Sequence, residues 1–146
     1  MNKKYEFVNG DEITIAPGRT VKRIRALVAI SYFASVGSLG GYIENEKSLD
    51  IYGNAWVSGD ARVYGNARVY GDGLIFWASK VGTENGTLTV YNTRDNALEV
   101  TRGCFRGNVD KFLSASEIKH DDQTHLEYRL LIEIAHSRIS RARSKA

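Results

Sequence analysis

The chain has few of the residues that cross-link or interrupt a fold, with one cysteine and one proline among 146 residues. The lone Cys104 excludes an internal disulfide and is typical of a reducing compartment, and we expect it to pack as a small apolar residue. No apolar run approaches the roughly 18 residues that a membrane-spanning helix needs. The initial Met-Asn-Lys-Lys is not followed by the apolar core of a signal peptide. These absences predict a cytoplasmic protein with no membrane partner.

Several kinds of catalytic chemistry also lack their motifs. The chain contains no Gly-x-x-x-x-Gly-Lys phosphate loop, no Gly-x-Ser-x-Gly nucleophile elbow and no cysteine pair for zinc. Its three histidines, His120, His125 and His136, all lie near the C-terminus, and the first two are poorly spaced for a shared helical face. We therefore predict no catalytic residue, no metal site and no cofactor.

A repeat of six residues is what the chain does contain. From Ile51 to Tyr70 the sequence reads IYGNAW, VSGDAR, VYGNAR and VY, and each copy (a hexad) has a small residue four positions after its first aliphatic. Between them lies Gly-Asn or Gly-Asp, which tolerates the positive φ of a tight corner. Such units bury their apolar side only by stacking on their neighbours. The repeat therefore predicts short strands and sharp corners around a narrow aliphatic interior.

The hexads resemble the hexapeptide-repeat family, whose fold is a left-handed parallel β-helix with three hexads in each triangular coil. The register spans residues 39–86, which is eight hexads. The resemblance therefore implies a mainly β protein with fewer than three coils, and it implies a homotrimer because so short a coil is marginally stable alone. The order of residues 21–27, 39–44, the hexads and 103–107 is also similar to a group of bacteriophage and prophage proteins described as hypothetical or polymer-forming.

The segments on either side of the hexads predict different elements within one continuous domain. Residues 1–38 predict an N-terminal β cap on residues 39–86, with a hairpin at Asn9-Gly10 and a strand that reaches Ile30. Residues 87–146 predict a hairpin, formed by 88–91 and 98–100, and then two helices. We expect Asn108 to cap the first helix and Thr124, with Glu127 three residues later, to open the second.

Charge is distributed unevenly: the net charge is +3 over residues 1–38, −2 over 39–87 and +2 over 88–146. The last residues carry cations and no acid: Arg138, Arg141, Arg143 and Lys145. A basic tail can follow the phosphates of a nucleic acid, but we favour a frayed, solvated helix end. Nucleic acid is therefore an open alternative and not the favoured partner.

The outward positions of the coils supply the candidate surfaces. If the aliphatic and small residues point inward, the residue after each of them points outward, and coil stacking sorts these residues into faces. The expected oligomer interface is Tyr52, Trp56, Tyr70 and Leu74. The expected binding surface is Arg62, Arg68, Tyr64 and Lys80. Tyrosine can stack on a planar ligand and arginine can pair with an anion.

Together these observations favour a non-enzymatic binding protein. The bacteriophage resemblance implies that it acts in a host cytoplasm, where it binds a host protein, such as a defence protein, or sequesters a small anionic ligand such as a nucleotide. A coenzyme A-dependent acyltransferase is the first alternative, because the hexapeptide-repeat family includes such enzymes, although the hexads contain no histidine base. A structural or assembly protein is the second alternative.

Overall fold

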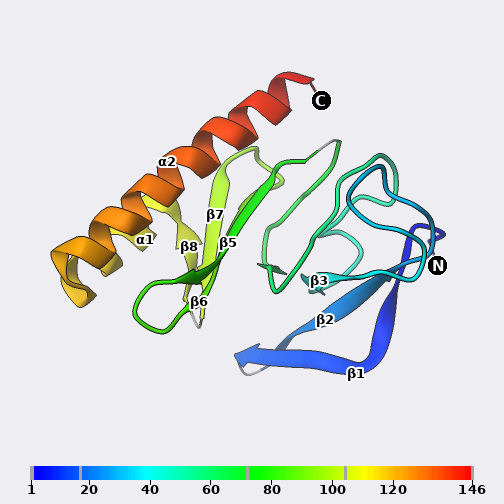
Figure 1. Ribbon diagram of the computed structural model, residues 1–146, viewed down its shortest axis with the longest axis horizontal. Helices are drawn as coiled ribbons and strands as arrows, with labels where there is room; N and C mark the ends of the chain where they lie inside the picture. The colour runs from blue at the N-terminus through cyan, green and yellow to red at the C-terminus, as the bar shows by residue number, and fades with distance from the viewer. Residues whose placement is uncertain (1, 17, 72, 104, 146) are drawn as a thin grey trace.

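The computed structural model describes residues 2–16, 18–71, 73–103 and 105–145. Within these ranges the chain forms two four-stranded sheets and two helices. The two helices pack against the second sheet, on the side away from the N-terminal strands (Figure 1). The expectation that Cys104 packs as a small apolar residue falls outside the described residues.

The first sheet has the strand order β1 (Tyr5–Ala16), β2 (Arg19–Ala26), β3 (Leu39–Ile43), β4 (Arg62–Val63). The first two pairings are antiparallel and the third is parallel. The hairpin expected at Asn9-Gly10 is wrong, because β1 runs on through an irregularity between Phe7 and Glu12. Gly10 adopts a φ of 83° there, so the glycine serves a bulge instead of a chain reversal.

The predicted parallel β-helix is wrong. Within residues 51–71, all of which the structure describes, β4 is the one regular strand. The rest of this segment consists of turns and irregular chain with isolated bridges. Downstream, β5 (Ile75–Val81) does not continue a coil but turns back and pairs antiparallel with β6 (Gly86–Asn92). The physical reason is the turn at 82–85, where Gly82 and Asn85 have positive φ and permit a hairpin. A long antiparallel ladder replaces the short parallel strands that a further coil would offer.

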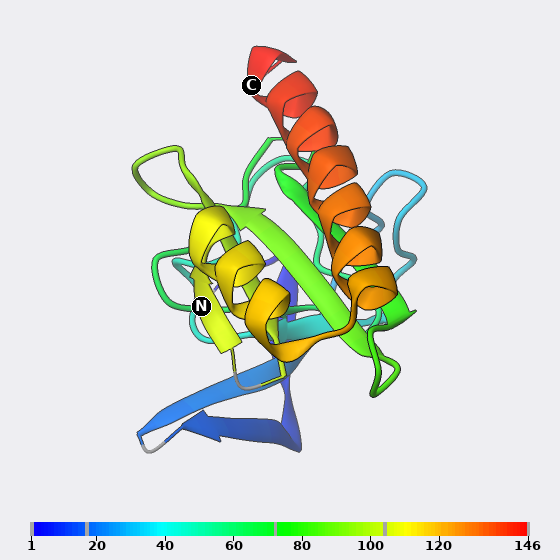
Figure 2. The same ribbon diagram turned by 90° about the vertical axis from the view of Figure 1, so that its left-hand side faces the viewer.

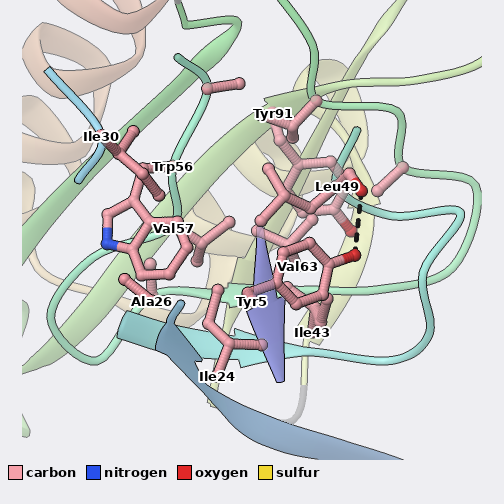
Figure 3. Packing of buried hydrophobic residues seen from close by; sticks show 14 residues of the cluster. Tyr5, Ile24, Ala26, Ile30, Ile43, Leu49, Trp56, Val57, Val63 and Tyr91 are labelled. Carbon is pink, nitrogen blue, oxygen red and sulfur yellow. Dashed lines mark hydrogen bonds between the residues drawn. The ribbon is translucent and has the colours of Figure 1, made fainter. Parts of the chain in front are cut away.

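The inward half of the repeat prediction is confirmed. The aliphatic and small residues of the hexads that are fully buried are Ala55, Val57, Ala61, Val63, Ala67 and Val69. The corner glycines Gly53, Gly59, Gly65 and Gly71 all have positive φ. The buried residues share one core with side chains of the first sheet, including Tyr5, whose hydroxyl donates to the Leu49 carbonyl at 3.0 Å (Figure 3). The spacing therefore identifies the interior although it does not identify the sheet.

The second sheet is antiparallel throughout, in the order β5, β6, β7 (Leu98–Arg102), β8 (Phe105–Asn108). The hairpin expected from 88–91 and 98–100 is confirmed as β6 and β7. Two helices cover this sheet, α1 (Val109–Lys119) and α2 (Asp122–Lys145), and both face the viewer in Figure 2. Their buried side chains form a second core with β6 and β7. Within the described ranges, neither helix combines the length and apolar character that a membrane crossing needs.

The helix caps agree with expectation at one helix and not at the other. Asn108 caps α1 by accepting a hydrogen bond from the Lys111 amide at 2.8 Å. The α2 helix begins two residues before Thr124, because the Asp121 carboxylate accepts from the Thr124 amide at 2.8 Å. Aspartate is among the strongest N-cap residues, and its charge also suits the positive end of a helix dipole.

The expectation of a frayed, solvated end for α2 is wrong at Arg143, which is docked. The Arg143 guanidinium donates from Nε to the Asn92 side-chain oxygen at 2.9 Å. A second nitrogen donates to the Ala97 carbonyl at 2.9 Å. Both acceptors belong to the end of β6 and the turn that follows it. The Arg143 cation thus binds the last turns of α2 to the end of the inner strand β6 and to the turn after it.

Candidate functional site

The outward positions of the hexads do not face solvent as a set. Trp56, Tyr64 and Leu74 are 4%, 1% and 1% exposed, so the expectation that they lie on outer faces is wrong. Without a closed triangular coil, neighbouring elements cover both sides of the chain: the Trp56 indole, for example, lies against Gly40 of β3. Tyr52 is exposed and Tyr70 is half-buried. The trimer contact predicted from Tyr52, Trp56, Tyr70 and Leu74 therefore has no common surface in this chain.

The four expected binding residues are also separated. The Arg68 guanidinium lies 4.4 Å from the ring centre of Tyr70 and lines a hollow with Glu46 and Asp50. Lys80 is exposed on β5, and Tyr64 is buried. Arg62 lines a different hollow from Arg68. Arg62 therefore remains a candidate binding residue in its own cleft, and it does not share a surface with Arg68, Tyr64 and Lys80.

The cleft at Arg62 lies where the two sheets meet and has a volume of about 270 Å³. The Arg62 backbone is bound to the second sheet on both sides: its amide donates to the Thr89 hydroxyl at 3.1 Å and its carbonyl accepts from the Thr101 hydroxyl at 2.8 Å. The side chain is thereby directed to the cleft, which Arg102 at the end of β7 and Thr87 of β6 also line. We call this space the polar hollow.

Two carboxylates near the polar hollow are held by a third arginine. Arg23 donates to Asp11 at 2.8 Å and lies 3.5 Å from an Asp60 oxygen. The Tyr42 hydroxyl donates to Asp11 at 2.9 Å and accepts from Arg23 at 2.7 Å, and burial raises the pKa of Tyr42 above its ordinary value. In the described chain no carboxylate pairs with Arg62. Asp11 is therefore paired with Arg23, and the Arg62 charge is available, although the exposed Asp60 carboxylate lines the same cleft.

A second space, the aromatic hollow, adjoins the polar hollow and has a volume of about 350 Å³. Three rings line it in edge-to-face order, with centres 5.4 Å apart for Phe105 and Phe112 and 5.0 Å apart for Phe112 and Tyr128. Lys119 and His120 also line it, and the His120 ring centre lies 5.6 Å from that of Tyr128. Phe105 is the half-buried ring of the three, so a flat apolar ligand can meet one ring. Such a ligand also meets charges of both signs, since the same space is lined by Lys119, Arg102 and Glu84.

Arg102 and Gly103 line both hollows and so form the junction between them. The Arg102 Nε donates to the Tyr128 hydroxyl at 3.1 Å, and the nearest carboxylate, that of Glu84, is 4.0 Å away. The guanidinium lies so close to Gly86 that a Cβ there would approach it to 2.6 Å. Gly86 thus allows Arg102 to lie flat over the β5–β6 turn, where one cation borders both spaces.

Sequence reasoning missed Arg102 and the three rings. No local motif marks them, because Arg102 and Gly86 become neighbours only once β6 and β7 pair, with Leu88 opposite Arg102. Gly86 is the one available signal, and the hexad register ends at this residue. Antiparallel pairing is what assembles this site.

Comparisons with protein-family models, curated protein sequences and solved structures found no match to the chain. They therefore lend no support to the hexapeptide-repeat or bacteriophage resemblance. Within the described ranges, no three His, Cys, Asp or Glu side chains gather into a group that could hold a metal ion. The candidate site is consequently argued from its own geometry.

Proposed function

We propose that this chain is a non-enzymatic binding protein for a small organic anion that carries both a phosphate-like group and a planar aromatic group, such as a nucleotide. The observation that carries the proposal is the junction at Arg102, where a polar hollow with Arg62 meets an aromatic hollow lined by three rings. The bacteriophage origin and the host target remain expectations of the sequence resemblance.

The two hollows suit the two ends of such a ligand. Arg62 and Arg102 can donate charge-assisted hydrogen bonds to an anion, each worth about 1.5–3 kcal/mol when it is well formed. Stacking of a base on an aromatic ring contributes about 1–3 kcal/mol. Phe105, which is half-buried, can provide such contact next to Arg102, whereas the Tyr128 ring is buried. A ligand that occupies both hollows is therefore stabilised by the hydrogen bonds and by the stacking. A ligand that has only the anionic group or only the aromatic group is stabilised by one of the two.

Calorimetric titration with adenosine 5′-monophosphate, adenosine and inorganic phosphate tests the proposal. We expect the monophosphate to bind, and each half-ligand to bind at least about tenfold more weakly, because each half loses one of the two contributions. Absence of heat with the monophosphate, or equal binding of adenosine, would contradict the proposal. Chromatography of the recovered monophosphate tests the non-enzymatic part, which predicts an unchanged compound.

A further inference from the structure

Helix α2 has two apolar faces, and one of them is uncovered. Its buried face packs on the second sheet through Tyr128, Ile132, Ala135 and Ile139. On the opposite side Leu126, Leu130 and Ile134 are 44%, 49% and 50% exposed. In Figure 2, where α2 faces the viewer, no other element lies over it. We call these three residues the α2 stripe.

The charges beside the α2 stripe are self-complementary. Residues four apart on a helix lie about 40° apart around its axis, so the stripe is continuous and centred on Leu130. Arg129 and Glu133 lie along the same edge of this stripe, on opposite sides of its centre. Both are exposed, and neither pairs with another charged side chain in the described chain. A two-fold contact requires such a pattern, because each copy must offer both halves of every interaction.

We propose that two copies of this chain pair through the α2 stripe, with their helices antiparallel and crossing at Leu130. A two-fold axis at this residue places Leu126 against Ile134 of the partner subunit. It also places Arg129 beside Glu133 of the partner subunit, twice in each dimer. Apolar residues spaced by four favour crossing helices at about −50°, since ridges of this spacing interdigitate at that angle. The contact uses neither hollow of the candidate site, so it stands independently of the proposed function.

Sedimentation equilibrium of the full chain over a concentration series tests the dimer. We expect the unaltered chain to be a dimer and Leu130→Glu to be a monomer, because the change puts two like charges at the crossing point. Val36→Glu is the matched control, since Val36 is an apolar residue that is 69% exposed and lies outside helix α2. It should remain dimeric. Circular dichroism confirms that both variants stay folded. A monomeric or trimeric unaltered chain would overturn the proposal.

Exchange of the charges tests the register. Arg129→Glu and Glu133→Arg should each weaken the dimer by about tenfold, because every opposite-charge contact becomes a like-charge contact. An equimolar mixture of the two variants should regain the original affinity as a heterodimer, since each copy then meets its opposite. A pair formed within one helix predicts no recovery on mixing. Failure of the mixture to recover would therefore overturn the antiparallel register.

Discussion

The two halves of this molecule each bury an apolar core, but they stabilise it by different means. In the second half, four antiparallel strands pair along their lengths, with one register shift between Ser79 and Val81, and two helices cover them. In the first half, the hexads contribute one two-residue strand and isolated bridges, and the chain is irregular between them. Burial is equally complete in both. The comparison shows that a fully buried interior does not require a continuous ladder around it.

Side chains replace part of the missing ladder in the first half. The Lys4 ammonium is buried and donates to the backbone carbonyls of Asp50 and Ala55 at 2.9 and 2.6 Å, with a longer bond to Tyr52 at 3.4 Å. Burial lowers the pKa of Lys4 from its ordinary value. One cation thus satisfies several carbonyls that would have strand partners in a regular sheet, and the first half depends on single residues more than the second.

The largest expected effect comes from a charge in the first core. Val63→Asp places an unpaired carboxylate at a fully buried position, and its transfer costs several kcal/mol against a total stability of about 5–15 kcal/mol. We expect loss of the folded state. Near-ultraviolet circular dichroism and thermal melting provide the measurement, and a soluble variant with a cooperative transition would contradict the assignment of Val63 to the core.

A smaller effect is expected at the cation that binds the irregular chain. Lys4→Met keeps the apolar stem but removes the donor of the buried Ala55 carbonyl and of the part-buried Asp50 carbonyl, which should lower the free energy of unfolding by about 3 kcal/mol. Lys3→Met is the control, because Lys3 is exposed and its loss should change little. Urea unfolding of both variants makes the comparison. Equal stabilities would show that the Lys4 bonds do not substitute for a ladder.

In the second half, removal of one docking cation should cost less because the ladder and the helices remain. Arg143→Ala deletes two hydrogen bonds at the end of α2 and should lower the unfolding free energy by about 1–2 kcal/mol. Arg141→Ala, at an exposed position two residues earlier, should leave it almost unchanged. If urea unfolding finds the two variants alike, the tail is solvated after all.

The smallest effect concerns the cap of α2 and depends on pH. The hydrogen bond from the Thr124 amide holds the pKa of Asp121 below its ordinary value of 3.8. Because the pKa of Asp121 is lower in the folded than in the unfolded chain, its contribution to folding stability is present above the unfolded pKa. This contribution is lost as the pH falls through the folded pKa. The stability difference between the unaltered chain and Asp121→Ala should therefore be constant near neutral pH and shrink below about pH 4. The new side chain of Asp121→Asn can also cap the helix but does not titrate, so the stability difference between Asp121→Asn and Asp121→Ala should not change with pH. If this difference also shrinks below about pH 4, the account is contradicted.

The halves also differ in how far the sequence predicts them. The hexads predict that their aliphatic and small side chains are inside, but they do not predict that Trp56, Tyr64 and Leu74 are buried as well. They do not predict pairing, since the apolar residues Ile75 and Val81 fit both a hexad register and a period of two. The β6–β7 hairpin and the Asn108 cap of α1 follow from local turn and cap chemistry, whereas the same chemistry at Asn9-Gly10 gives a bulge and not a hairpin. The junction at Arg102 depends on contacts between distant segments, and no local pattern encodes it.

The most direct test of the central claim compares two arginines that the repeat alone treats alike. Arg62 lines the polar hollow next to Arg102, whereas Arg68 lies over Tyr70 in another hollow. Calorimetric titration of adenosine 5′-monophosphate should show that Arg62→Ala weakens binding at least about tenfold, because a charge-assisted bond is lost, and that Arg68→Ala leaves binding unchanged. Both variants should keep the stability of the unaltered chain, since the Arg62 contacts with the second sheet are made by its backbone. Equal losses in the two variants, or a loss in Arg68→Ala alone, would contradict binding at the Arg102 junction.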